Sequence, residues 1–197
     1  MCNLYRLDPS QKVFDFTAEE IQQLNVPLDI YPNYPGIVIE SGQPKAMNWG
    51  FPARLKHMKP TSKPKPVNNT RDDKLRTFFW RDSFERRRCL IPVSQWAEAW
   101  GKPGAMTKTW YSLPDTDAFA VAGIWRHSDE WGLCYSMVMT DANMQMAEAH
   151  DRMPVILAPD DYQQWTHGTP DEAFALVQTW QGPLVVDATD ELWSVKR

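Results

Sequence analysis

The second residue of the chain, Cys2, would combine two reactive groups after removal of the initiator Met1. Cysteine is small enough that an initiator methionine before it is normally removed, which leaves an α-amine and a thiol on adjacent carbons. The pKa of such an amine is about 8, so a sizeable neutral fraction exists at neutral pH, and the thiolate is a strong nucleophile. This aminothiol can trap an aldehyde, because the amine forms an imine and the thiol closes a thiazolidine ring. The alternative is a buried cysteine that packs as a small hydrophobic residue.

Three further polar residues lie in apolar or structured surroundings and could assist this chemistry. Glu98 lies between Trp96 and Trp100, where an apolar setting would raise the carboxyl pKa and suit a general acid or base. His150 precedes an apolar segment, as would suit a proton shuttle, and Asn69 could position a reacting group by hydrogen bonding. Each also has a structural interpretation: an exposed glutamate on the wet face of a strand, a capping or exposed histidine, and a turn asparagine.

Positive charge is concentrated between residues 54 and 88. This segment holds 12 Lys and Arg against four Asp and Glu, whereas the rest of the chain holds nine basic and 21 acidic residues. A basic segment on an acidic protein favours a polyanionic partner. Residues 52–68 contain four prolines, which predict an extended loop rather than a helix. With Trp49 beside it and Lys63 and Lys65 within it, this loop suits single-stranded nucleic acid; a solvated lysine-rich loop is the alternative.

Length and composition narrow the class of protein. A chain of 197 residues, 43% hydrophobic and 23% charged, suits one globular domain, placed at residues 1–197. No apolar run approaches the roughly 18 residues of a membrane helix and no signal pattern opens the chain, so we expect a cytoplasmic protein without membrane contact. The three cysteines are too scattered for a zinc framework and odd in number for disulfides, so no metal or other cofactor is expected.

The side chains that could do chemistry need a scaffold, and the local patterns predict short strands and short helices. A capping box that begins at Thr17 predicts a helix over residues 18–25. A turn at residues 41–44 joins its two flanking segments into a hairpin. Strands are predicted at residues 36–40, 45–50, 89–93, 106–112, 119–125, 132–140, 153–157 and 184–186. Helices are predicted at 142–149, 160–166, 171–179 and within 71–88, the last with Leu75, Phe78, Phe79 and Phe84 inward.

The order of these elements predicts an α+β fold. Segments 119–125 and 132–140 are nearly continuous in apolar residues, which indicates that the centre of the sheet is buried. We therefore expect a single domain with a largely antiparallel sheet, curled toward a barrel and flanked by short helices.

Several short motifs share the order and spacing of one known family. They are Met1-Cys2, Asn69-Thr70-Arg71, Arg88-Cys89-Leu90-Ile91-Pro92, Glu98 before a tryptophan, Ala122-Gly123-Ile124-Trp125 and His150-Asp151-Arg152-Met153-Pro154. On these motifs the chain resembles the SRAP family, the SOS response-associated peptidase-like proteins, also called abasic-site processing proteins. The resemblance spans residue 2 to about residue 165, and the ordered set is more specific than any single motif.

The resemblance implies a barrel-like α+β domain that binds single-stranded DNA containing abasic sites and covalently captures the ring-opened sugar aldehyde. Cys2 would be the nucleophile, Asn69 would position the sugar and the terminal amine, and Glu98 would assist imine formation and ring closure as acid or base. His150 would donate a proton to the sugar oxygen and take part in reversal. The residues implied in phosphate binding are Arg71 and Arg152.

The chain departs from the family pattern at three places. Asn3-Leu4 follows the cysteine where the family often has Gly-Arg, and Arg6 is the nearest arginine. Thr70 occupies the middle of an Asn-Ala-Arg motif, and Ala99 follows the glutamate where the family commonly has tryptophan.

Three other functions also fit these residues. A thiol autopeptidase could use Cys2, Glu98 and His150 to remove Met1 or a short leader, and this could coexist with aldehyde capture because self-processing would expose Cys2. Abasic-site lyase activity is a further expectation. A non-catalytic single-strand-binding module would rest on the basic segment alone. In each case we expect a cytoplasmic monomer that joins the nucleoid when bound to DNA.

Overall fold

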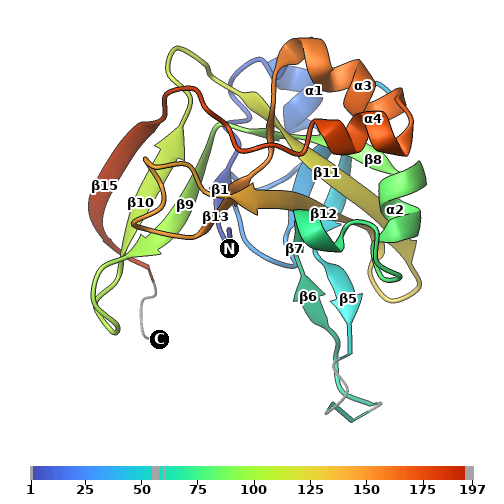
Figure 1. Ribbon diagram of the computed structural model, residues 1–197, viewed down its shortest axis with the longest axis horizontal. Helices are drawn as coiled ribbons and strands as arrows, with labels where there is room; N and C mark the ends of the chain where they lie inside the picture. Colours follow the sequence, from blue (N-terminus) through green and yellow to red (C-terminus); the bar gives the residue numbers. More distant parts are fainter. Residues whose placement is uncertain (1, 55–57, 60, 194–197) are drawn as a thin grey trace.

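A closed barrel forms the centre of the molecule (Figure 1). The computed structural model describes residues 2–54, 58–59 and 61–193. Within these residues, the barrel strands in chain order are β3 (Pro35–Glu40), β4 (Gln43–Trp49), β8 (Arg88–Val93), β11 (Phe119–Ser128) and β12 (Gly132–Asp141). Strand β12 closes the ring because it pairs antiparallel with β11 and parallel with β4.

The central barrel strands are buried on both faces, which explains their continuous apolar runs. Every residue of β8, the first six of β11 and the seven from Cys134 to Thr140 in β12 are buried. Helix α3 (Tyr162–His167) packs on β8, and α2 (Arg81–Arg86) packs on β8 and β11, on the right of Figure 1. Burial of this apolar area is the main stabilising contribution to the barrel.

A second, fully antiparallel sheet lies beside the barrel, on the left of Figure 1. Its order is β15 (Val185–Leu192), β10 (Thr107–Ser112), β9 (Gln95–Trp100), β1 (Tyr5–Arg6) and β2 (Asp29–Ile30). Trp96 stacks on Tyr111 at 5.4 Å between ring centroids and meets Phe119 of the barrel edge-on at 5.9 Å. The apolar core is therefore continuous between the two sheets.

A pair of buried tyrosines ties the amino-terminal strand to the barrel. The hydroxyl groups of Tyr5 in β1 and Tyr135 in β12 are hydrogen bonded, and Tyr5 also meets the ring of Trp49 edge-on at 5.0 Å. Gly36 leaves the space for this pair, because a Cβ at that position would clash with both hydroxyl oxygens. Strand β1, and with it the residues just before it, is thereby held against the barrel wall.

A two-stranded arm projects from the barrel at the bottom of Figure 1. It consists of β5 (Phe51–Ala53) paired with β6 (Lys65–Val67). Gly50 begins the arm at φ +127°, where a side chain would be strained and would also meet Pro66. The loop predicted over residues 52–68 is thus extended at both ends and paired there, while residues 55–57 and 60 lie outside the described residues.

The remaining elements flank these sheets. Strand β7 pairs parallel with β12, while β13 and β14 pair antiparallel with β12 and β11. Their bounds, and those of the short helices, are β7 (Asn69–Arg71), β13 (Arg152–Pro154), β14 (Ile156–Leu157), α1 (Ala18–Gln22), η1 (Asp72–Lys74), η2 (Pro159–Asp161) and α4 (Pro170–Ala175). No helix in the described part of the chain is long and apolar enough to cross a membrane.

The expected α+β fold with a largely antiparallel, barrel-like sheet is confirmed, and so are the capping box of α1 and the β3–β4 hairpin. The helix predicted at residues 142–149 is wrong, because this segment forms turns. There the Asn143 side chain accepts from the Met146 amide and donates to the Trp180 carbonyl, which ties the turns to the chain near Trp180. The predicted helix at 171–179 is shorter, ending at Ala175.

The inward placement predicted for Phe78 and Phe79 is also wrong. Leu75 and Phe84 are buried as expected, but Phe78 is 93% exposed and Phe79 is 38% exposed. The chain between η1 and α2 forms turns, so the helical spacing that would align these aromatic residues is absent. The Arg126 guanidinium lies 4.5 Å from the Phe79 ring centroid, and this cation–π contact stabilises the ring at the surface.

Candidate active site and nucleic-acid interface

Two asparagine side chains hold the backbone carbonyl of Cys2. The amide nitrogen of Asn69 donates to this oxygen at 2.7 Å and that of Asn68 at 2.9 Å. The thiol donates to the Leu4 carbonyl at 3.4 Å, and Cys2 is fully buried. Both lone pairs of the Cys2 carbonyl oxygen therefore accept hydrogen bonds, which hold the backbone of Cys2 in place.

The barrel positions both asparagines. Asn69 lies in β7, opposite Met137 of β12 in a parallel pairing. The carbonyl of Asn68 accepts from the Met137 amide at 3.0 Å and from the Trp49 indole nitrogen at 2.9 Å. Sequence reasoning selected Asn69 and missed Asn68, since two adjacent asparagines after a proline-rich segment also suit a turn.

The buried position of Trp49 argues against the role in DNA binding that was expected for it. The ring is fully buried and its Nε1–H is used by the Asn68 carbonyl. Stacking on a nucleobase needs an exposed ring face, which Trp49 does not offer in this structure. Trp49 instead supports the asparagine pair from within the core.

The Asn69 side chain retains an acceptor besides the amide group that donates to Cys2. Its Oδ1 is buried and has no hydrogen-bond partner among residues 2–54, 58–59 and 61–193. A buried, unpaired amide oxygen costs about 1–3 kcal/mol, and native proteins usually avoid it. This oxygen can accept a hydrogen bond from a group that arrives beside Cys2.

Glu98 is a buried carboxyl close to Cys2. It lies in β9 opposite Thr109 of β10 and is 3% exposed, which rules out the alternative of a glutamate on a wet strand face. Burial raises the pKa of Glu98 to about 7, and the negative charge of Asp151 acts in the same direction. A carboxyl with a pKa of about 7 can both donate and accept a proton near neutral pH.

The thiol of Cys2 is protonated in this environment. Burial raises its pKa well above the usual value, and the nearby charge of Glu98 raises the pKa further. The thiolate is therefore scarce, and nucleophilic attack by sulfur needs a base to remove the proton. Glu98 in its ionised form is a base within electrostatic reach.

His150 lies where the turns of residues 142–149 meet β13. Its backbone N–H donates to the Met146 carbonyl at 3.0 Å, and its Nδ1 accepts from the Arg152 backbone N–H at 2.9 Å. Burial lowers the pKa of His150. The Asp151 carboxylate acts in the opposite direction, but the pKa still lies below its usual value. A neutral imidazole is thus favoured at neutral pH, as a proton shuttle requires.

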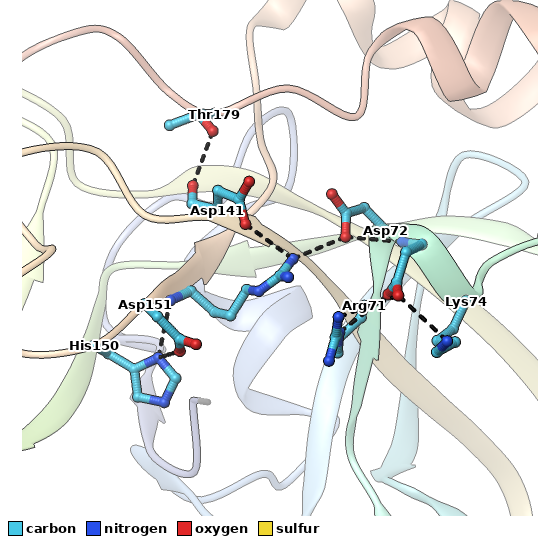
Figure 2. A network of polar contacts seen from close by, with 9 residues as sticks. Arg71, Asp72, Lys74, Asp141, His150, Asp151 and Thr179 are labelled. Atoms are coloured by element: carbon cyan, nitrogen blue, oxygen red, sulfur yellow. Dashed lines mark hydrogen bonds and ion pairs between the residues drawn. The ribbon is translucent and has the colours of Figure 1, made fainter.

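The two arginines implied in phosphate binding both carry carboxylate partners; Arg71, Asp72 and Asp141 are labelled in Figure 2. Arg152 Nη1 lies 2.8 Å from Asp72 Oδ1 and 3.2 Å from Asp141 Oδ1. Asp141 is the cross-strand neighbour of Arg152 in the β12–β13 pair, which explains this contact. Arg71 Nε lies 3.0 Å from Asp73 Oδ1. A guanidinium has five N–H donors, so these ion pairs leave donors for a phosphate.

Fewer cations of the basic segment are available to bind a phosphate than its net charge suggests. Arg88 is buried and donates to the backbone carbonyls of Phe84, Glu85, Trp165 and Gly168, so it is structural. Several others form ion pairs with carboxylates: Arg54 with Glu130, Lys74 with Asp73, Arg76 with Asp171, and Arg86 and Arg87 with Asp82. Among the described residues of this segment, the exposed cations without an ion pair to another described residue are Lys59, Lys63, Lys65 and Arg81.

Three solved structures from two bacteria have the same fold. A protein of Bordetella bronchiseptica matches with a TM-score of 0.77 at 20% identity, over 95% of this chain and 99% of that chain. A protein of Bacteroides thetaiotaomicron matches with a TM-score of 0.77 at 17% identity, over 95% and 91%. A phage-related protein of B. bronchiseptica gives 0.67 at 16% identity, over 95% and 93%. At these identities the likeness concerns the fold alone.

Two curated relatives match part of the chain. The abasic site processing protein YoaM of Bacillus subtilis (strain 168) is 34% identical over 85 residues, which are 40% of this chain and 37% of that protein. The abasic site processing protein YoqW of the same bacterium is 29% identical over 110 residues, which are 51% of this chain and 49% of that protein. The chain thus spans half or less of the length of the curated relatives it matches.

One family model covers nearly the whole chain. The model described as SOS response associated peptidase (SRAP) matches residues 1–191, which include Cys2, both asparagines, Glu98 and His150. The chain therefore belongs to the SRAP family of SOS response associated peptidases.

Proposed function

We propose that this protein processes abasic sites in single-stranded DNA by trapping the sugar aldehyde on Cys2 after removal of Met1. The observation that carries the proposal is the Cys2 carbonyl, held by Asn68 and Asn69 at 2.9 and 2.7 Å beside the buried carboxyl of Glu98. This arrangement holds the aminothiol carbon skeleton still while leaving the amine and thiol to react. The curated relatives named abasic site processing proteins support the same substrate class.

The proposed reaction is a condensation that releases one water. The Cys2 amine adds to the aldehyde carbon of the ring-opened sugar and gives a carbinolamine, which loses water to form an imine. The sulfur then adds to the imine carbon, forming the C–S bond, and the thiol proton ends on the ring nitrogen. No bond is oxidised or reduced, so proton transfer is the only assistance required.

Proton transfer is assigned to Glu98 and His150. With a pKa of about 7, Glu98 can protonate the departing hydroxyl and then take the thiol proton. His150 donates a proton to the sugar oxygen as the ring opens and takes it back during reversal. Asn69 orients the amine through its buried Oδ1.

The DNA strand is proposed to follow the exposed cations and one exposed aromatic ring. Lys63 and Lys65 lie on the projecting arm and supply charge without competing ion pairs in the described residues. Phe78, 93% exposed and close in the chain to α2, offers the free ring face that Trp49 lacks. Arg71 and Arg152 hold phosphates near Cys2.

A thiol autopeptidase remains the second candidate. The closeness of Cys2 to a carboxyl that titrates near pH 7 favours it, because that carboxyl can activate the thiol. The asparagine pair does not serve this reaction directly: the bond to be cleaved joins Met1 to Cys2, and its carbonyl belongs to Met1, whereas Asn68 and Asn69 hold the carbonyl of Cys2. A binding module without catalysis would leave the buried Glu98 unexplained.

Intact-protein mass spectrometry tests the proposal. The purified protein is incubated with a single-stranded oligonucleotide that carries one abasic site. We expect loss of Met1 and a covalent adduct equal to protein plus oligonucleotide minus one water. Cys2→Ala should form no such adduct while retaining non-covalent binding, and Cys134→Ala, which changes another buried thiol, should react as the parent protein does. An equal adduct yield in Cys2→Ala would exclude the mechanism.

A further inference from the structure

Two groups compete for one ring nitrogen of His150 (Figure 2). The backbone N–H of Arg152 donates to Nδ1 at 2.9 Å, and the carboxylate oxygen Oδ1 of Asp151 lies 2.9 Å from the same atom. An imidazole nitrogen has a single in-plane site, which holds either a lone pair or a hydrogen. Nδ1 can therefore satisfy only one of these partners at a time.

The two arrangements differ in what the other ring nitrogen presents. When Nδ1 accepts from the Arg152 amide, a neutral imidazole carries its proton on Nε2 and acts there as a donor. When Nδ1–H donates to Asp151, a neutral imidazole has a lone pair on Nε2 and acts there as an acceptor. The partner of one nitrogen determines the tautomer and so the role of the other.

We propose that Asp151 is a positioning residue that sets the tautomer of His150 and thereby allows the same ring to give a proton and to take it back. The inference rests on the proposed function, which assigns both transfers to His150. Asp151 itself is not assigned a contact with the reacting sugar. It acts by stabilising the Nδ1–H form against the Arg152 amide, which stabilises the Nε2–H form.

The charged groups around Asp151 leave its carboxylate available to the His150 ring. Among the described residues its ion pair is with His150, and its side chain is 86% exposed, so no buried network fixes it elsewhere. The neighbouring cation, Arg152, is bound instead to Asp72 and Asp141. Glu98 is another titratable group within electrostatic reach of Asp151. A readout specific to the His150 ring is therefore needed to separate an effect on the tautomer from an effect on Glu98.

The consequence for the reaction is that one ring can both give and recover the proton. Ring opening of the sugar needs a donor, which the imidazolium form supplies: its Nε2–H gives the proton, and the neutral Nδ1–H form that Asp151 stabilises is left. Reversal needs the proton to return to the ring, which the Nδ1–H tautomer permits by exposing an Nε2 lone pair. Loss of a carboxylate that orients a catalytic histidine leaves the wrong tautomer in place and slows proton transfer.

The test combines ring nitrogen spectroscopy with kinetics on Asp151→Asn. In protein labelled with ¹⁵N at histidine, long-range ¹H–¹⁵N spectra above the pKa of His150 should show averaged shifts in the parent protein. In Asp151→Asn, Nδ1 should move to the unprotonated position and Nε2 to the protonated one, since a carboxamide can donate to Nδ1 but cannot stabilise Nδ1–H as a carboxylate does. Reversal, followed by adding a labelled competing abasic strand to preformed adduct, should slow by about tenfold or more, whereas formation should change less.

The matched control is Asp129→Asn, which removes a carboxylate that lies 4.0 Å from Nδ1 of a different histidine, His127. It should leave both the His150 shifts and the reversal rate unchanged. Identical His150 shifts in the parent protein and in Asp151→Asn would overturn the inference, as would shifted tautomers with an unaltered reversal rate and pH profile. Absence of any adduct in the parent protein would instead count against the proposed function, while the spectra would still report the tautomer.

Discussion

The side-chain amide of Asn69 donates a 2.7 Å hydrogen bond to the backbone carbonyl of Cys2, across 67 positions of sequence. Asn68 reinforces this contact from the adjacent position at 2.9 Å. The first residue of the proposed mature chain would otherwise be free to fray, as chain termini usually are. These two hydrogen bonds hold the terminal nucleophile in a fixed position, as a rigid sheet holds the residues within it.

Replacement of Asn69 by Ala should slow adduct formation. The substitution removes one of two donors to the Cys2 carbonyl and the buried acceptor beside it, and a hydrogen bond of this kind is worth about 0.5–1.5 kcal/mol. Single-turnover kinetics with an abasic oligonucleotide should show a rate about tenfold lower. Asn48→Ala is the control, because its amide donates to the Trp131 carbonyl at 2.7 Å, a bond that involves no part of the site. Equal rates for both variants would remove Asn69 from the reaction.

Glu98→Gln should change the pH dependence of stability. The folded pKa of Glu98 is about 7 against 4.5 in its ordinary state, so the unfolded chain loses this proton first as the pH rises. The free energy of unfolding of the parent protein should therefore fall between pH 4.5 and 7, by about 3 kcal/mol in full. Glutamine stays neutral, so this part of the slope should vanish.

Urea unfolding of the two proteins at several pH values between 4 and 8 checks the sign. The difference between them should be small at pH 4 and should favour Glu98→Gln at pH 8. Adduct formation in the same variant should be slower by about 10²-fold or more, and its rate should no longer change near pH 7. A variant that is less stable than the parent at pH 8 would contradict the raised pKa.

Replacement of Lys63 and Lys65 together by Ala should weaken the salt dependence of DNA binding. Each phosphate contact to a single strand contributes about −0.7 to the slope of log K against log salt. Removal of both lysines should reduce the magnitude of the slope by about 1.4. Fluorescence anisotropy with an undamaged single strand at several salt concentrations gives this value. The control is the double substitution of Lys12 and Lys102, two exposed lysines outside the arm. If both double variants behaved alike, the arm would have no particular role in binding.

Gly36→Ala should destabilise the protein by about 1–3 kcal/mol, because the added Cβ would clash with the hydroxyls of Tyr5 and Tyr135. Thermal or urea unfolding measures this loss. Tyr135→Phe removes one of the clashing oxygens, so the double variant should be more stable than the sum of the two single effects. Strict additivity would show that the tyrosine pair is not what excludes a side chain at this position.

The chemical candidates could be named from sequence because their residue types are unusual in their settings. A cysteine in second position, a glutamate between tryptophans and a histidine before an apolar strand each carry a local signal. The same holds for the strands with continuous apolar runs, such as residues 119–125, and for the capping box of α1. These features depend on local propensity and periodicity, which a single sequence contains.

Which of these residues meet depended on the tertiary structure. Cys2 contacts Asn68 and Asn69 only because β7 pairs in parallel with β12 and β1 is held to the same strand through Tyr5 and Tyr135. Such pairings join positions far apart in the chain, and no local pattern encodes the partner of a given strand.

The surfaces, too, were decided by packing rather than by residue type. Trp49 and Phe78 are both aromatic residues near the basic segment, yet the barrel buries the first and a turn exposes the second. Most arginines of residues 54–88 are held by carboxylates or by backbone carbonyls, so the net charge of the segment overstates what a phosphate could reach. The sequence determined the reactive groups and the periodicity of the apolar residues. The closure of the barrel determined which groups lie together and which remain accessible. The reason is that burial and ion pairing depend on neighbours that only the folded chain supplies.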